Sequence, residues 1–200
     1  MLPALVDGRI PFRKTEFFYI LAGFRKVTIV SVQYGGKEDV TDSVGLLISI
    51  LVRYPEVSTI YYDPTDHVLR FNFVSSGIVQ EKQLQSIQQT LLDSIEALNF
   101  LEHKKTRLVE IHCQTCYDLT MIEVRRDVDT LVQEEISLLV TLMQQMDYNI
   151  VTEGNDGLFE EDLLMQEEII EHMLESVKDT AGDKNLFAFR EEGRVLVFNQ

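Results

Sequence analysis

The residues with the most chemical potential lie in the ten-residue stretch VEIHCQTCYD, residues 109–118. It contains both cysteines of the chain, Cys113 and Cys116, with His112 directly before the first. Thiolates and imidazoles are zinc ligands, and a Cys-x-x-Cys pair can also form a reversible disulfide. These three residues are therefore the candidate metal or redox site, and a metal ion is the one cofactor that the sequence raises.

The residues around this pair favour neither chemistry. A redox Cys-x-x-Cys normally precedes a helix whose dipole lowers the pKa of the first thiol, whereas YDLTMIEV after Cys116 predicts a turn and a strand. A structural zinc site usually takes four ligands, and the sequence has no second such pair. Neighbours such as His112 and Cys113 point to opposite faces of a strand. Two ordinary strand thiols, a metal site completed by a second copy of the chain, and a redox pair all stay open.

Other titratable clusters are weaker. Asp63, Asp66 and His67 fall in a predicted turn, where such residues usually serve the turn itself. Glu168 and His172 are one helical turn apart, but zincin and di-iron motifs need further ligands at other spacings. The sequence contains neither a phosphate-binding loop nor a nucleophile elbow. No catalytic residue is predicted, and the balance is against an enzyme.

The charge of the chain restricts its partners. A net charge of −15 at pH 7 disfavours nucleic acid and an anionic membrane surface. Residues 1–100 hold 11 acidic and 9 basic residues, whereas residues 101–200 hold 22 and 9. The sequence has no apolar run long enough to cross a membrane and no secretory leader. We therefore expect a soluble, cytoplasmic protein.

Periodicity predicts an α+β protein. Alternation predicts a strand at 25–34, a hairpin over 58–76 with its turn at Asp63–Asp66, strands at 106–115 and 119–127, and a hairpin over 186–198. Helical spacing predicts helices from about 42 to Pro55, at 79–103 and 128–147, and an acidic helix at 158–180. Residues 15–23 fit a short helix or a buried strand.

This element order suggests a mainly antiparallel sheet with helices packed on it. Residues 25–115 have the βαββαβ order of a ferredoxin-like fold, followed by a further strand, two helices and a C-terminal hairpin. We predict an α+β body over 1–150, with the acidic helix and hairpin of 151–200 packed on it. A single domain over 1–200 is the alternative, and the glycine-containing loop at 149–157 is the predicted hinge.

Two helices have a clear predicted core face. Apolar residues of the 79–103 helix recur at steps of three and four, which is the pattern of one buried stripe. Its members are Leu84, Ile87, Leu91, Ile95, Leu98 and Leu101. In the 128–147 helix the core candidates are Leu131, Ile136, Leu139, Val140 and Met143.

Three functions fit these observations. The first is a regulatory or protein-interaction module that self-associates as a homo-oligomer, most simply a dimer, because open antiparallel sheets often leave a face or edge for a partner. The C-terminal strand GRVLVFNQ is a candidate edge. The second is a metal-dependent or thiol-based activity at Cys113 and Cys116. The third is a sensor of an unknown small-molecule ligand near residues 149–157. We rank the first highest.

Overall fold

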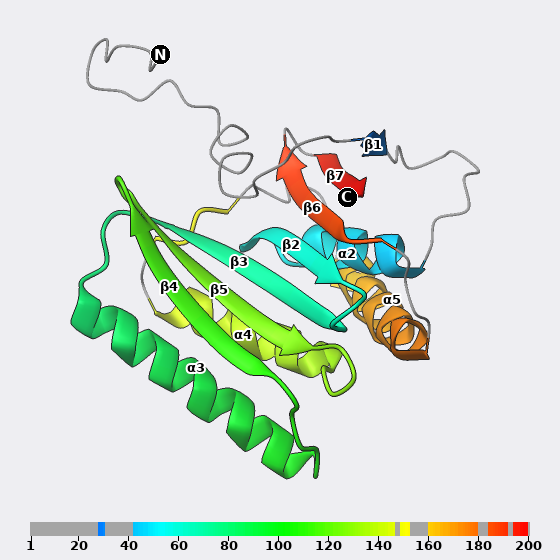
Figure 1. The fold of residues 1–200 in the computed structure, drawn as a ribbon, viewed down its shortest axis with the longest axis horizontal. Coiled ribbons are helices and arrows are strands. Elements are labelled where there is room, and N and C mark those ends of the chain that lie inside the picture. The colour runs from blue at the N-terminus through cyan, green and yellow to red at the C-terminus, as the bar shows by residue number, and fades with distance from the viewer. Residues whose placement is uncertain are drawn as a thin grey trace.

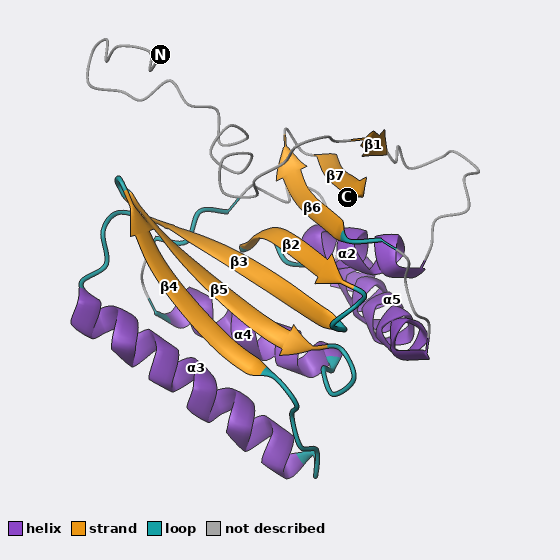
Figure 2. Ribbon diagram, viewed as in Figure 1, coloured by secondary structure: helices purple, strands orange, loops and turns teal. Residues whose placement is uncertain are grey.

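The strands that the structure describes form one antiparallel sheet (Figures 1 and 2). The computed structural model describes residues 28–30, 42–146, 149–152, 160–179, 184–191 and 194–199. Across the sheet the described strands follow the order β1-β7-β6-β2-β3-β5-β4. Their bounds are Thr28–Val30 (β1), Val57–Asp63 (β2), Val68–Ser76 (β3), Val109–Cys116 (β4), Leu119–Asp127 (β5), Leu186–Glu191 (β6) and Arg194–Asn199 (β7).

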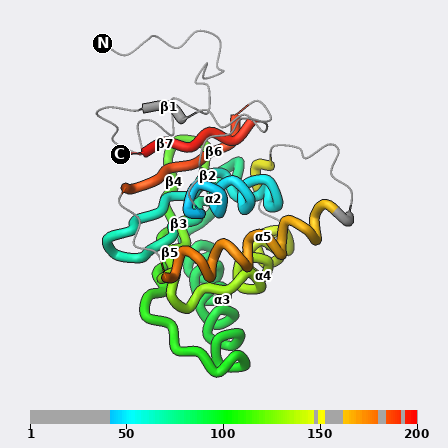
Figure 3. The backbone as a smooth tube through the Cα atoms, turned by 90° about the vertical axis from the view of Figure 1, so that its right-hand side faces the viewer, coloured from blue at the N-terminus to red at the C-terminus, as the bar shows by residue number. Residues whose placement is uncertain are grey.

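Four helices in the described part of the chain cover one side of this sheet (Figure 3). They are α2 (Asp42–Arg53), α3 (Glu81–Leu101), α4 (Gln133–Gln145) and α5 (Glu160–Asp179). All four contribute buried apolar residues to a single core cluster. The prediction of an α+β protein with helices packed on an antiparallel sheet is confirmed. Of the helices described, none is long and apolar enough to cross a membrane.

Strand alternation decides which side chains enter this core. In β3, Leu69, Phe71 and Phe73 are buried under the helices, and the register places Val124 and Ile122 of β5 beside the last two. Residues between them point to the opposite face, because side chains alternate along a strand. On that opposite face, β6 and β7 contribute a second apolar cluster of Phe187, Phe189 and Phe198.

The ferredoxin-like arrangement is not confirmed. In a ferredoxin-like sheet the third strand of the unit, which is the second strand of its hairpin, lies between the first and the second strand. Here β3 lies between β2 and β5, and β1 lies at the far edge beside β7. The hairpin of β2 and β3 forms as expected. Its two neighbours in the sheet, β6 beside β2 and β5 beside β3, come from segments that are distant in sequence.

The C-terminal hairpin continues the same sheet. β6 pairs with β2 from Thr59↔Phe189 to Tyr62↔Leu186, and β7 pairs with β1. β7 is therefore not an edge strand, which corrects the expectation for GRVLVFNQ. The domain boundary near residue 150 stays a prediction, and residues 153–157 of the predicted hinge lie outside the described residues.

Most element positions match the sequence pattern, with two informative differences. α4 begins at Gln133 and not near 128, because the Asp127 carboxylate accepts hydrogen bonds from the backbone N–H and the hydroxyl of Thr130 and closes a turn there. Leu101 is exposed, although the pattern assigns it to the buried stripe of α3. The core candidates of α4 are all buried. The segment 15–23 and most of the 25–34 strand lie outside the described residues.

Candidate functional site

The two thiols of the sequence motif lie on opposite faces of β4. Cys113 belongs to the face under the helices, where it packs against the main core, and Cys116, three residues on, takes the other face. Both are free thiols. Burial, with a smaller contribution from the charge of Glu81, raises the pKa of Cys113 to about 11. Its thiol therefore stays protonated at neutral pH, the form that neither binds metals nor attacks disulfides.

His112 does not join either thiol. It lies on the same strand face as Cys116 but four residues away, which is about 13 Å along a strand. Its Nε2 atom is 3.3 Å from Oε2 of Glu110. Within the described residues, no group of three or more His, Cys, Asp or Glu side chains is arranged to hold a metal ion. The metal or redox assignment of His112, Cys113 and Cys116 stays a prediction, and this geometry does not bring the three together.

The turn residues Asp63, Asp66 and His67 serve the hairpin. Oδ1 of Asp63 accepts hydrogen bonds from the backbone N–H groups of Thr65 and Asp66, at 3.0 and 3.2 Å. Nδ1 of His67 lies 3.2 Å from Oδ1 of Asp129. The bonds to Asp63 close the turn, as the turn interpretation predicts, and the contact of His67 links the turn to Asp129, just after β5.

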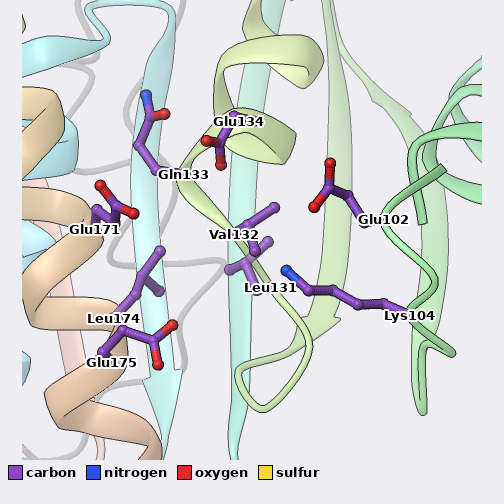
Figure 4. A pocket seen from close by; sticks show the side chains of 9 residues that line it. All are labelled: Glu102, Lys104, Leu131, Val132, Gln133, Glu134, Glu171, Leu174 and Glu175. Atoms are coloured by element: carbon purple, nitrogen blue, oxygen red, sulfur yellow. The ribbon is translucent and has the colours of Figure 1, made fainter.

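An acidic cleft opens between three helical segments (Figure 4). Glu171 and Glu175 of α5 face Glu134 at the start of α4, with Glu102 and Lys104 just after α3 on the far side. The cavity has a volume of about 190 Å³. Its lining consists of Glu102, Lys104, Leu131, Val132, Gln133, Glu134, Glu171, Leu174 and Glu175. Four carboxylates against one ammonium suit a cation better than an anion, but nothing else among the described residues points to a ligand there.

A buried ionic network is centred on Arg126 of β5. Nε and Nη2 of its guanidinium donate to the carboxylate of Glu135. Nη1 donates to the carbonyl of Leu108 at 2.7 Å and to Asp127, and Nη2 also donates to Oγ1 of Thr130. All five N–H groups thus have acceptors. Burial alone would lower the pKa of Arg126, but the hydrogen bond and charge of Glu135 together with those of Asp127 raise it.

Asp127 and Asn99 extend this network to neighbouring elements. Oδ1 of Asp127 accepts hydrogen bonds from the backbone N–H groups of Arg107 and Leu108, at 3.1 and 2.8 Å. Burial by itself would raise the pKa of Asp127, whereas the bonds from Thr130, Leu108 and Arg126 hold it below its ordinary value. Nδ2 of Asn99 donates to Oε2 of Glu135 at 2.9 Å. The network therefore fastens the end of α3 to α4, β5 and the start of β4.

α3 runs beside the edge strand β4 (Figure 1). Nε2 of Gln88 donates a 3.1 Å hydrogen bond to the carbonyl of Ile111, so the helix satisfies a backbone group at the sheet edge. Covering an edge strand with a helix is one way in which proteins prevent further strand pairing. At this edge of the sheet, α3 therefore forms the outer surface of the molecule. We name residues 78–101 together with the β4–β5 turn at Tyr117 and Asp118 the α3 margin.

The α3 margin exposes large apolar side chains at both of its ends. At one end Ile78 and Tyr117 are 67% and 77% exposed. The backbone N–H of Gly77 donates a 2.7 Å hydrogen bond to the carbonyl of Asp118, which holds these two residues at one corner. At the other end Phe100 and Leu101 are 77% and 71% exposed. Elsewhere in the described residues only Leu164 and Met165 of α5 are large, apolar and exposed.

Tyr117 also has an unusual backbone. Its φ angle is +53°, a left-handed conformation that is an outlier for a bulky residue and costs about 1–3 kcal/mol. Its exposed ring contributes nothing to the core to offset that cost. The two-residue turn between Cys116 and Leu119 requires a positive φ at its first position, so this hairpin holds Tyr117 in that conformation.

Comparisons with protein-family models, curated proteins and solved structures find no match for this chain. The sequence interpretation missed the buried network, although Arg126 falls on an inward position of the alternating β5 strand. It also missed the α3 margin, for which the signal is Phe100, an aromatic residue on the polar side of the helical stripe.

Proposed function

We propose that this protein is an interaction module that binds a second copy of itself through the α3 margin. The observation that carries the proposal is that large apolar residues are exposed at both ends of the α3 margin. The helix has 21 residues, which is about 31 Å at ~1.5 Å per residue. A two-fold interface uses the same surface on both copies. Two antiparallel helices therefore bring Ile78 and Tyr117 of one copy to Phe100 and Leu101 of the other.

The distribution of charge supports the same surface. Each copy has a net charge of −15, so two copies repel one another wherever acidic surface meets acidic surface. α3 contains three acidic residues and one basic residue, whereas α5, of similar length, contains eight acidic residues and one basic residue. The centres of protein interfaces are depleted of charge and enriched in aromatic residues. The α3 margin meets both criteria better than α5 does.

Sedimentation equilibrium over a range of concentrations tests the proposal. We expect a monomer–dimer equilibrium for the natural sequence. Replacing both exposed residues at the end of α3, in Phe100→Ser/Leu101→Ser, should raise the dimer dissociation constant about a hundredfold, because their apolar surface no longer leaves water on association.

The matched control is Leu164→Ser/Met165→Ser, which removes a similar exposed apolar area from α5 and should leave the dissociation constant unchanged. A natural protein that stays monomeric at its highest soluble concentration would overturn the proposal. Equal weakening by both double variants would also overturn it, since association would then not depend on the α3 margin.

A further inference from the structure

A stripe of exposed side chains on the α3 margin has a palindromic spacing. Its seven members are all exposed: Ile78, Lys82, Gln85, Gln89, Asp93, Glu96 and Phe100. The steps between them are four, three, four, four, three and four residues. From Lys82 onward they share one face of the helix, because steps of three and four return to the same side. The pattern therefore reads the same in both directions from Gln89.

The chemistry of the stripe is also complementary about Gln89. Reversing the stripe places an apolar residue opposite an apolar residue at its ends, Ile78 with Phe100. It places Lys82 opposite Glu96, which have opposite charges. Glutamine amides can hydrogen-bond to carboxylates and to each other, so Gln85 meets Asp93 and Gln89 meets its own copy.

Two charges of this stripe, Lys82 and Glu96, form no ion pair in the part of the chain that the structure describes. Asp93 accepts a 2.7 Å hydrogen bond from Nε2 of Gln89 through Oδ1, which leaves its second carboxylate oxygen for another donor. Lys82, Glu96 and the second carboxylate oxygen of Asp93 are thus left for the contacts that the reversed stripe would make.

We infer that two copies pack α3 against α3 in antiparallel orientation, with the two-fold axis at Gln89 and Lys82 of each copy paired with Glu96 of the other. This inference rests on the proposed self-association and adds its register. In a two-fold interface a contact from residue i to residue j occurs twice. Each dimer thus contains two Lys82–Glu96 pairs, and a change at either position acts twice.

A charge-reversal cycle measured by sedimentation equilibrium tests the register. Lys82→Glu places two carboxylates opposite each other, and Glu96→Lys places two ammonium groups opposite each other. We expect each single variant to raise the dimer dissociation constant about tenfold. The double variant Lys82→Glu/Glu96→Lys restores opposite charges and should return the dissociation constant to within about threefold of the natural value.

Net charge alone predicts a different result. Glu96→Lys makes the chain less negative and would tighten association if only overall repulsion mattered, whereas the proposed register weakens it. A dimer that is unaffected by either reversal, or one that the double variant does not restore, overturns this register and leaves the proposed function standing. A natural protein that is monomeric overturns both. Circular dichroism checks that each variant remains folded.

Discussion

Two helices of nearly equal length, α3 and α5, lie at different places on the sheet and differ in charge and in how they are attached to the rest of the fold. α5 packs along α2, carries eight acidic residues, and is linked to α2 by an ion pair from Arg53 to Glu167 whose side chains are about one quarter exposed. α3 runs along the sheet edge, carries few charges, and is fastened at its end by the buried network of Asn99, Glu135 and Arg126.

Under the proposed self-association, this difference explains why α3 rather than α5 would contact a second copy. Repeated carboxylates on α5 keep that surface hydrated and repel a second copy. The α3 margin instead combines the low charge of its helix with exposed apolar residues at both of its ends. A helix that forms an interface must also keep its position when its outer face contacts another chain. A buried network in which every polar group is hydrogen-bonded provides such a fixed attachment. The two attachments can be compared directly by mutation.

The largest difference is expected between Glu135→Ala and Glu167→Ala. The first leaves the fully buried Arg126 without its main partner and should lower the free energy of unfolding by about 3–5 kcal/mol. The second removes a partly exposed ion pair and should cost about 1 kcal/mol or less. Urea unfolding followed by circular dichroism measures both. Similar losses for the two variants would show that the attachments of α3 and α5 do not differ in this way.

The attachment of α3 through Asp127 should also make the free energy of unfolding depend on pH in acid, with a smaller loss of stability than in Glu135→Ala. The folded-state pKa of Asp127 is lowered, so its contribution is fully present above its ordinary pKa of about 3.9. That contribution is lost as the pH falls through the lower folded pKa. The stability difference between the natural protein and Asp127→Asn should be constant near neutral pH and shrink below about pH 4. A difference that does not change with pH would contradict this account.

The reaction rates of the two thiols test whether α3 stays packed against β4 in solution. Cys113 is half-buried with its pKa raised to about 11, so it should react with a thiol reagent at pH 8 at least about tenfold more slowly than Cys116, since the thiolate is the reactive form. The variants Cys116→Ser and Cys113→Ala each leave one thiol for the measurement. Equal rates would mean that Cys113 is not protected in solution.

The smallest expected effect concerns the strained turn at the other end of the α3 margin. Asparagine tolerates the left-handed backbone better than tyrosine does, so Tyr117→Asn should raise the free energy of unfolding by about 0.5–1 kcal/mol. If the ring takes part in association, the same variant should weaken the dimer. A gain in stability with unchanged association would remove Tyr117 from the interface.

Local pattern was enough to predict most elements of the described chain. Alternation identified β2, β3, β4 and β5, and helical spacing identified α3 and the buried face of α4. The order of strands was not predictable in the same way, because the pairings β2–β6 and β3–β5 join segments that are distant in sequence. A ferredoxin-like order shares the local β2–β3 hairpin and differs in the long-range pairings around it.

The candidate surface was harder to find, for a physical reason. A hydrophobic stripe predicts what a helix buries but not where the core beneath it ends, so Leu101 was assigned to the core although the last buried position of α3 is Asn99. Arg126 illustrates the opposite error, a buried residue that the pattern does not predict to be buried. A charged residue at an inward strand position is expected to be exposed unless its partners are known. Glu135 and Asp127 become partners only when the chain is folded.

Cysteine trapping at the centre of the stripe tests the central claim most directly. In a Cys113→Ala/Cys116→Ser background, Gln89→Cys places one thiol on the proposed two-fold axis, where facing helices at about 8–10 Å bring Cα atoms within the ~4.4–6.8 Å that a disulfide needs. Glu168→Cys, exposed on α5, is the matched control. Mild oxidation should give a covalent dimer of the Gln89→Cys protein and leave the control monomeric. No covalent dimer from Gln89→Cys, or an equal yield from both, would contradict the account.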